Sequence, residues 1–353
     1  LKDIKSVEKL KTQRYVIVKD LDSEEKLSES DKEIKKLGVK AYIVMGIRKD
    51  KELIGSFNIS FSNKGLITDE LIQLCSEISS GIGLSIYEKN LEEALQSEKE
   101  HLFELNKDVT DSIRYATRIQ NAHFPSENFL NKHGIKTDLY YSPKDIVSGD
   151  FYWWTKVDNK LIITVSDCTG HGVPGALMTI LGLNNLRMIV EQMKTVNPGD
   201  ILTQLNSALY NSLATEDNSF IDGMDMSLIV YDLDDKSLLY SSAKRPIVQI
   251  SEGEVMKYFG DKISLGEKSD TVYNTKSIYL KPGDKVLMYS DGFVDQFGGG
   301  TNKKFGTKQL TALIEANRNE SFEVLTGDML ARYMAWKGDA EQIDDVTFLS
   351  LEF

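Results

Sequence analysis

The sequence predicts an α+β protein in which a β-sandwich flanked by helices follows a small α/β unit and a long helix. Three observations lead to this fold class. Short apolar runs of strand length, separated by turn residues, fill the second half of the chain. Two pairs of helical segments interrupt these runs, as expected for helices that flank a β-sandwich. The stretch from residue 69 to about residue 122 contains no proline and has a helical pattern.

Composition sets limits on the function. The chain has 353 residues, with 41% hydrophobic and 27% charged residues, which is typical of a globular protein with more than one domain. A net charge of −12 argues against a nucleic-acid partner. No apolar run approaches the ~20 residues that span a bilayer, and no signal peptide is evident. Two cysteines are too few for a disulfide framework and favour the cytoplasm. Because the sequence starts at Leu1, we expect a fragment, whose parent is free to carry a membrane segment upstream.

Residues 1–90 are predicted to form a small sensor domain. Three strands are expected, at Arg14–Lys19, Ala41–Ile47 and Leu53–Phe61, with a solvated acidic stretch at Ser23–Lys36. Thr68 is a candidate N-cap for the helix that follows. This order of elements resembles the C-terminal part of a GAF domain. The resemblance implies a ligand or signal sensor, and a truncated dimerisation scaffold is an equally good interpretation.

Residues 91–125 are predicted to be a helical linker that ends at Pro125. Apolar positions recur in alternating steps of three and four, which is typical of a coiled-coil seam and implies a homodimer. Glu98 and Ser112 interrupt the seam, so both a static spacer and a seam that shifts register fit the pattern. The seam positions are Leu95, Glu98, Leu102, Leu105, Val109, Ser112, Ala116 and Ile119.

Residues 126–353 are predicted to be the third domain. Four helices are expected in it, over residues 174–193, 198–214, 308–315 and 322–336. The first of these is apolar nearly all round and is expected to be buried. The predicted strands cover residues 137–142, 151–156, 161–167, 226–232, 238–242, 247–251, 277–280, 285–289 and 346–353.

Four acidic residues stand on or near the ends of these strands: Asp150, Asp167, Asp291 and Asp344. Asp-Gly pairs are common turn residues, so any one of the four has an ordinary explanation. The whole set predicts a site for a hard cation, because carboxylate oxygens are the ligands that Mg²⁺ and Mn²⁺ prefer.

The segments around these acids carry a family resemblance. They read SGDFY, SDCTGHGVPGAL, YSDGFVDQFGG and QIDDVTFLSLEF, in this order. The set resembles the motifs of the metal-dependent serine/threonine protein phosphatases (the PPM family), in the SpoIIE-like branch found in bacterial signalling. The resemblance covers about residues 131–353 and implies an α-β-β-α sandwich.

The resemblance also implies roles for individual residues. Asp167 would bridge two Mn²⁺ or Mg²⁺ ions, and the backbone carbonyl of Cys168 would help to bind one of them. Asp150 would serve the second ion. Asp291 and Asp344 would complete the first, with Asp345 as the alternative if the final acid pair is shifted by one residue.

The implied reaction is the attack of a water, activated by the two metals, on a phosphoserine or phosphothreonine of a partner protein. The implied substrate class is an anti-sigma-factor antagonist. Two alternatives remain open: a metal-dependent phosphohydrolase of a small phosphoester, and a binding module without catalytic activity.

The sequence departs from the family pattern in two places. Many relatives read Ala-Gly-His-Pro-Pro where this chain has Ala243-Lys244-Arg245-Pro246. The two cations would contact substrate phosphate or line a turn, and the turn is favoured. Trp153 stands where the family pattern has an acid, which argues against a third metal.

A thiol-based mechanism at Cys168 is excluded, because Pro174 occupies the position of the arginine that such enzymes need. His171, between two glycines, is expected to be a structural hydrogen-bonding residue and not a catalytic acid.

Overall fold

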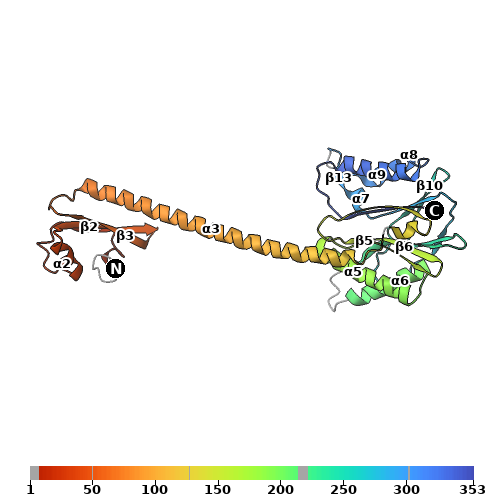
Figure 1. Cartoon of the computed structure of the whole chain (residues 1–353), viewed down its shortest axis with the longest axis horizontal. Helices are drawn as coiled ribbons and strands as arrows, with labels where there is room; N and C mark the ends of the chain where they lie inside the picture. The colour runs from red at the N-terminus through yellow and green to blue at the C-terminus, as the bar shows by residue number, and fades with distance from the viewer. Residues whose placement is uncertain (1–7, 50, 127, 214–221, 301–302) are drawn as a thin grey trace. The chain divides into compact units, whose positions relative to one another are not determined.

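The computed structural model describes residues 8–49, 51–126, 128–213, 222–300 and 303–353. The chain divides into two compact units, residues 1–107 and 108–353. Each unit is described by itself (Figure 1).

The first unit contains a three-stranded antiparallel sheet in the order β1-β2-β3. Its strands are β1 (Tyr15–Val18), β2 (Ala41–Lys49) and β3 (Glu52–Phe61), close to the predicted ranges. Both faces of β2 are buried, because alternate residues enter two different apolar clusters. One cluster contains Leu10, Val16, Leu21, Tyr42 and Val44. The other contains Ala41, Ile43, Met45, Ile67 and Cys75.

Part of the acidic stretch of this unit forms a helix that the sequence analysis did not predict, and none of its residues is buried, in agreement with the expected solvation. Helix α2 (Glu29–Lys36) begins at a capping box, in which Ser28 and Asp31 satisfy each other's backbone N–H groups. Acidic residues fill its first turn and basic residues its last, which favours the helix dipole. The Tyr42 hydroxyl donates to Asp31 at 2.9 Å and holds the helix to β2.

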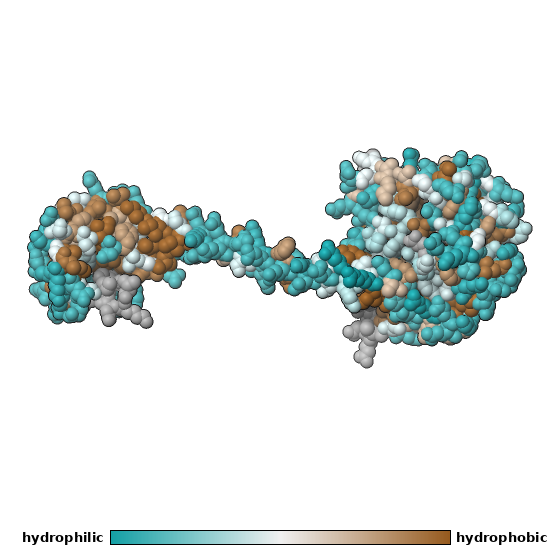
Figure 2. All heavy atoms as spheres, in the orientation of Figure 1, coloured by the Kyte–Doolittle hydropathy of each residue, from teal (hydrophilic) through white to brown (hydrophobic). Residues whose placement is uncertain are grey.

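Helix α3 (Asp69–Asn121) confirms the predicted long helix. Thr68 caps it, with its hydroxyl oxygen accepting from the Leu71 N–H at 3.2 Å. Figure 2 shows hydrophobic residues gathered on the visible face of the first unit and isolated hydrophobic residues farther along the helix. The large apolar residues of the seam are about half exposed: Leu95, Leu102, Leu105, Val109 and Ile119.

The second unit confirms the predicted sandwich of two antiparallel sheets. One sheet has the order β11-β8-β7-β6-β5 and the other the order β10-β9-β12-β15-β4. The first comprises β5 (Asp150–Val157), β6 (Lys160–Cys168), β7 (Met224–Asp232), β8 (Leu238–Ala243) and β11 (Lys276–Ile278). The second comprises β4 (Lys136–Ser142), β9 (Ile247–Ser251), β10 (Glu254–Tyr258), β12 (Lys285–Tyr289) and β15 (Val346–Glu352). Strand β10 is absent from the prediction.

Helices cover both outer faces of the sandwich (Figure 1). Those on the β5–β8 side are α5 (Gly172–Arg187), its π-helical continuation η1 (Met188–Gln192) and α6 (Pro198–Leu213). The predicted end of α6 at residue 214 lies outside the described residues. Those on the other side are α7 (Gly292–Asp295), α8 (Gly306–Ala316) and α9 (Phe322–Lys337). The short elements α4 (Asn128–Asn131), β13 (Phe297–Gly298) and β14 (Lys303–Lys304) complete the unit.

Three apolar clusters separate these layers. The central one joins the facing sides of the two sheets, since it contains Ile163 from the first sheet and Met288 and Leu349 from the second. The outer two lie under the helices. Alternate residues of β6 enter different clusters, Ile162 the outer and Ile163 the central, which explains why this strand is apolar on both faces.

One helical stretch in the described part of the chain, Gly172–Gln192, has the length and apolar composition of a membrane span. It is α5 with η1, and half of its apolar window is buried inside the second unit. Leu183, Leu186 and Ile189 pack in the cluster that lies against β5 and β6. The stretch is therefore a core helix of the sandwich, and the sequence analysis also predicted a buried helix here.

Candidate functional site

A row of three carboxylates crosses the first sheet. Asp150 on β5 lies directly opposite Asp167 on β6, and Asp167 lies directly opposite Asp225 on β7. Directly opposed side chains share one face of a sheet, with Cβ atoms about 5 Å apart. This face is the one that continues into the central cluster through Tyr152 and Ile163. The row therefore lies at the end of the layer between the two sheets.

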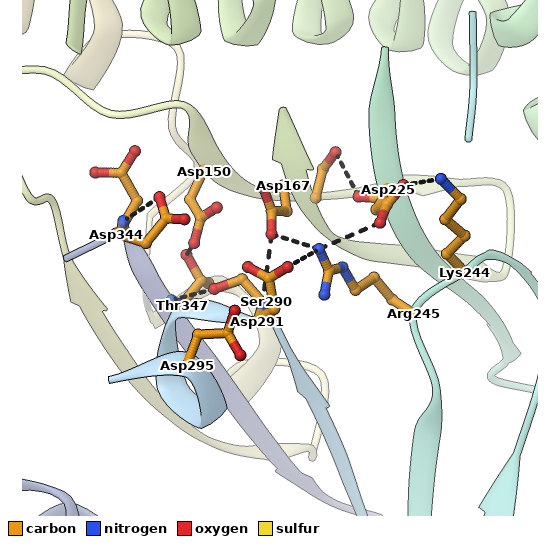
Figure 3. Close-up of polar contacts among 12 residues, drawn as sticks. Asp150, Asp167, Asp225, Lys244, Arg245, Ser290, Asp291, Asp295, Asp344 and Thr347 are labelled. Atoms are coloured by element: carbon orange, nitrogen blue, oxygen red, sulfur yellow. Dashed lines mark hydrogen bonds and ion pairs between the residues drawn. The ribbon is translucent and has the colours of Figure 1, made fainter. Parts of the chain in front are cut away.

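The second sheet brings two further acids to this row. Asp291 follows β12 and precedes α7, and its backbone N–H lies 3.5 Å from Asp167 Oδ2. Asp344 precedes β15, next to Asp345. The Thr347 hydroxyl donates to Asp150 Oδ2 at 2.8 Å, which ties β15 to β5. The structure thus brings the four predicted acids to one place, where the ends of both sheets meet (Figure 3).

Burial in this cluster disfavours the ionised carboxylates. Burial raises the pKa of Asp150 to about 7, although hydrogen bonds from Ser290 and Thr347 oppose the rise. Burial and then the charge of Asp150 raise the pKa of Asp167 well above its ordinary value. Burial likewise raises the pKa of Asp344. Like charges directly opposite one another are destabilising, so this row needs a cation.

Arg245 supplies a positive charge to the row. Its guanidinium lies 2.8 Å from Asp167 Oδ2, 2.7 Å from Asp291 Oδ2 and 3.2 Å from Asp225 Oδ2 (Figure 3). Burial alone would raise the pKa of Asp291, but the charge of Arg245 and its hydrogen bond outweigh burial and lower it. The expectation that this residue only lines a turn is therefore wrong, because its side chain reaches the acids from the β8–β9 connection.

The donor set fits a hard divalent cation in its chemistry. All four predicted acids offer carboxylate oxygens, and the raised pKa values of Asp150 and Asp167 mark negative charge that a cation would stabilise. Among the described residues, no three acidic, histidine or cysteine side chains converge closely enough to hold a metal as they stand. The Arg245 guanidinium lies between Asp167 and Asp291 and pairs with both, which explains why these two carboxylates do not approach each other more closely.

The glycine-rich turn after β6 packs against the start of β5. A Cβ on Gly149 would lie 2.3 Å from the Gly170 carbonyl oxygen, and a Cβ on Gly175 would lie equally close to it. Gly170 has φ +85°, a conformation that favours glycine. Only glycine fits at this contact, which places Asp150 and Asp167 side by side.

Two neighbours of the acids have structural contacts. Asp345 accepts from the backbone N–H groups of Lys144 and Gly149, each at 2.7 Å, so both of its carboxylate oxygens are used. His171 contacts Asp145 at 2.6 Å and Lys144 at 2.9 Å, in line with the expected role in hydrogen bonding.

Cys168 is buried, and burial raises the pKa of its thiol well above the ordinary value. This agrees with the exclusion of a thiol nucleophile.

Asp225 is the acid that the sequence analysis missed. The predicted strand starts at Met226, one residue after Asp225, whereas β7 starts at Met224 and includes this acid. An acid followed by the apolar run of residues 226–231 was the available signal. Its carboxylate accepts from the Ser264 hydroxyl at 2.6 Å as well as pairing with Arg245.

Comparison with known proteins identifies relatives of this unit. The family model for stage II sporulation protein E (SpoIIE) matches residues 157–353. The phosphoserine phosphatase RsbU of Bacillus subtilis (strain 168) is 23% identical over 224 residues, which cover 62% of this chain and 61% of RsbU. Protein IcfG of Synechocystis sp. is 25% identical over 235 residues, which cover 60% of this chain and 37% of IcfG. The chain thus spans less than two thirds of either curated relative.

Solved structures of PP2C phosphatase domains are also similar to this unit. The SiaA PP2C domain of Pseudomonas aeruginosa is 30% identical with a TM-score of 0.63, covering 70% of this chain and 98% of that domain. A SpoIIE structure from Bacillus subtilis, with the PP2C phosphatase domain and a fragment of the regulatory domain, is 20% identical with a TM-score of 0.51. That match covers 62% of this chain and 63% of the SpoIIE chain and concerns the fold alone. Since the family model begins at residue 157, the GAF-like interpretation of the first unit stays a prediction.

Proposed function

Because this chain belongs to the SpoIIE family, we propose that it is a metal-dependent serine/threonine protein phosphatase of bacterial signal transduction. The observation that carries the proposal is the row of opposed carboxylates, which Asp291 joins from the second sheet. Opposed acids at the junction of two sheets destabilise the fold. A divalent cation bound between them would neutralise their charge and would explain why they are present. A relative named as a phosphoserine phosphatase supports the same reaction class.

We assign the acids as ligands of Mn²⁺ or Mg²⁺. Two such ions, when bound, would activate water for attack on phosphorus and stabilise charge on the phosphoryl oxygens. Asp167 stands at the centre of the row and is assigned to both ions, with the carbonyl of Cys168 beside it. Asp150 is assigned to the second ion, and Asp291 and Asp344 to the first.

Asp345 is a positioning residue in this proposal. Both of its carboxylate oxygens accept from backbone N–H groups, those of Lys144 and Gly149. In the half-buried Asp344, one carboxylate oxygen accepts from the Asp345 N–H, and the second oxygen is assigned to the metal.

The proposed substrate is a phosphoserine or phosphothreonine in an anti-sigma-factor antagonist, and the proposed compartment is the cytoplasm. Residues 1–90 are proposed as the sensor, 91–125 as the linker and 126–353 as the phosphatase domain.

The test is phosphate release from a phosphoserine peptide and from p-nitrophenyl phosphate, with and without Mn²⁺, using the whole 353-residue chain. Turnover of the peptide that requires Mn²⁺ is the expected result. Turnover that persists in the presence of a chelator would contradict the metal assignment.

A binding module without catalytic activity is the second candidate, because Arg245 already neutralises part of the acid row. That candidate predicts no turnover and no Mn²⁺ binding that depends on the carboxylates.

We also propose that the α3 seam joins two copies of this chain. Its leucines are about half exposed along one helical stripe, and burying them against a second helix removes apolar surface from water. Leu102→Glu and Leu105→Glu should each shift the protein from dimer to monomer in sedimentation equilibrium. Phe103→Glu is the matched control, because Phe103 is 72% exposed and lies outside the seam. A wild-type monomer at tens of micromolar would refute the proposal.

A further inference from the structure

Arg245 is held at the acid row by a rigid connection. It lies between β8 and β9, where the chain crosses from the first sheet to the second. The Lys244 N–H donates to the Asp261 carbonyl oxygen at 2.7 Å, and the Arg245 N–H donates to the Ala243 carbonyl oxygen at 2.7 Å. Lys244 has φ +60°, which costs energy for a residue with a side chain. The backbone therefore fixes where the Arg245 side chain starts.

The guanidinium is only partly satisfied in this position. A single nitrogen, Nη2, makes the contacts with Asp167, Asp225 and Asp291. Nε is buried and has no hydrogen-bond partner among the described residues. A buried arginine that serves only as a structural tie normally uses its planar set of donors, often in two parallel hydrogen bonds to one carboxylate. The observed contacts are instead those of a point charge placed among several acids.

Two of the three carboxylates that Arg245 contacts, Asp167 and Asp291, are proposed metal ligands. Oδ2 of Asp167 and Oδ2 of Asp291 each lie within 2.8 Å of its Nη2. A divalent cation bound by these oxygens would stand beside a guanidinium of the same sign, in a partly buried site. Like charges repel strongly at such distances when they are buried. Arg245 and the cation therefore cannot both hold Asp167 and Asp291 without loss of binding energy.

We propose that Arg245 is a tethered counter-ion that competes with the divalent cation for Asp167 and Asp291 and so weakens metal binding at this site. The inference rests on the proposed function, because it takes the two acids as metal ligands. It assigns this chain a higher metal requirement than a relative with a histidine in the same position. Loading the site would then require the guanidinium to leave the two carboxylates, so the β8–β9 connection becomes a determinant of metal affinity.

The test measures Mn²⁺ affinity by isothermal titration calorimetry on the whole chain. Arg245→Gln should bind Mn²⁺ more tightly than the wild type by on the order of 10- to 100-fold, the equivalent of one or two charge-assisted hydrogen bonds. Lys244→Gln is the matched control, since it removes the same charge from the adjacent residue. Lys244 lies 3.9 Å from Asp225 and from Glu267, and its ion pairs do not include Asp167 or Asp291. Its affinity should stay within about threefold of the wild type.

Further variants keep the test decisive. If Arg245→Gln does not fold, Arg245→His should fold and bind Mn²⁺ more tightly above pH 8, because a neutral imidazole does not compete. Adding Asp167→Asn to either variant should abolish the gain, which locates it at this site.

Equal or weaker Mn²⁺ binding in both Arg245 variants, with metal-dependent turnover intact in the wild type, would overturn this inference alone. Absence of Mn²⁺ binding in the wild type and in both variants would overturn the proposed function and this inference together.

Discussion

Phosphate release by the Asp167→Asn variant is expected to fall about a thousandfold or more, on the order of the loss when a strong electrostatic stabiliser is removed from an active site. Asp167 is the central member of the acid row, with Asp150 opposite it on one side and Asp225 on the other. An amide in its place keeps the shape and removes the charge that would hold two cations. Asp291→Asn should cause a similar loss, because Asp291 joins the row from the second sheet.

The fold should survive the Asp167→Asn substitution. Asparagine removes a like charge next to Asp150, and Arg245 keeps its contacts with Asp225 and Asp291. The unfolding midpoint measured by circular dichroism should therefore change little. Asp138→Asn on β4 is the control for activity, because Asp138 is exposed and pairs across the sheet with Ser350, away from the row. Activity of the Asp167 variant equal to that of the control would refute the metal assignment.

Gly175→Ala is expected to destabilise the protein by about 3 kcal/mol, the upper range for overpacking a tight contact. The added Cβ would lie 2.3 Å from the Gly170 carbonyl oxygen and 2.8 Å from Gly149 Cα. Both are backbone atoms, so no side-chain rotation relieves the clash. The first turn of α5 would have to move away from the ends of β5 and β6, and activity should fall with stability.

Gly327→Ala provides the matched control for this prediction. Gly327 also lies inside a helix, α9, but a Cβ there meets nothing within 4 Å. Alanine should stabilise this position by about 0.5–1 kcal/mol, because it loses less conformational entropy than glycine on folding. Urea unfolding followed by circular dichroism measures both variants. Equal stabilities would show that the glycine turn tolerates a side chain and does not set the positions of the acids.

Much of the sandwich follows from local sequence patterns. Strand β6 is apolar on both faces because it lies between two clusters, and this pattern is visible in the sequence without any tertiary information. Asp167 lies near the end of such a strand and Asp291 lies two residues after another, so both were predictable as strand-end residues. Helix α2 was not predicted, because its sequence is polar and has no apolar periodicity. Its stability depends on the Ser28–Asp31 capping box and on a contact with Tyr42, which lies outside this stretch.

The contact of Arg245 with the acids could not be predicted from the sequence. It depends on strand register, which places Asp225 opposite Asp167, and on the direction in which the β8–β9 connection crosses between sheets. Neither property is encoded by residues close to Arg245 in the chain. The local sequence around Arg245 is equally compatible with a cationic side chain that lines a turn and with one that reaches buried acids.

The position of β15 has a consequence for the order in which the protein is made. This strand lies inside the second sheet, between β12 and β4, yet it follows both of them in the chain and is synthesised after them. Thr347 and Asp344 therefore reach Asp150 only after nearly 200 further residues have been synthesised, and β4 and β12 wait unpaired along the edges that β15 will occupy. Long-range pairings of this kind form late and leave strand edges exposed meanwhile. A nascent chain that ends at β12 would carry Asp150, Asp167 and Asp225 but neither Asp344 nor Thr347, so the acid cluster is completed only when β15 pairs with its neighbours.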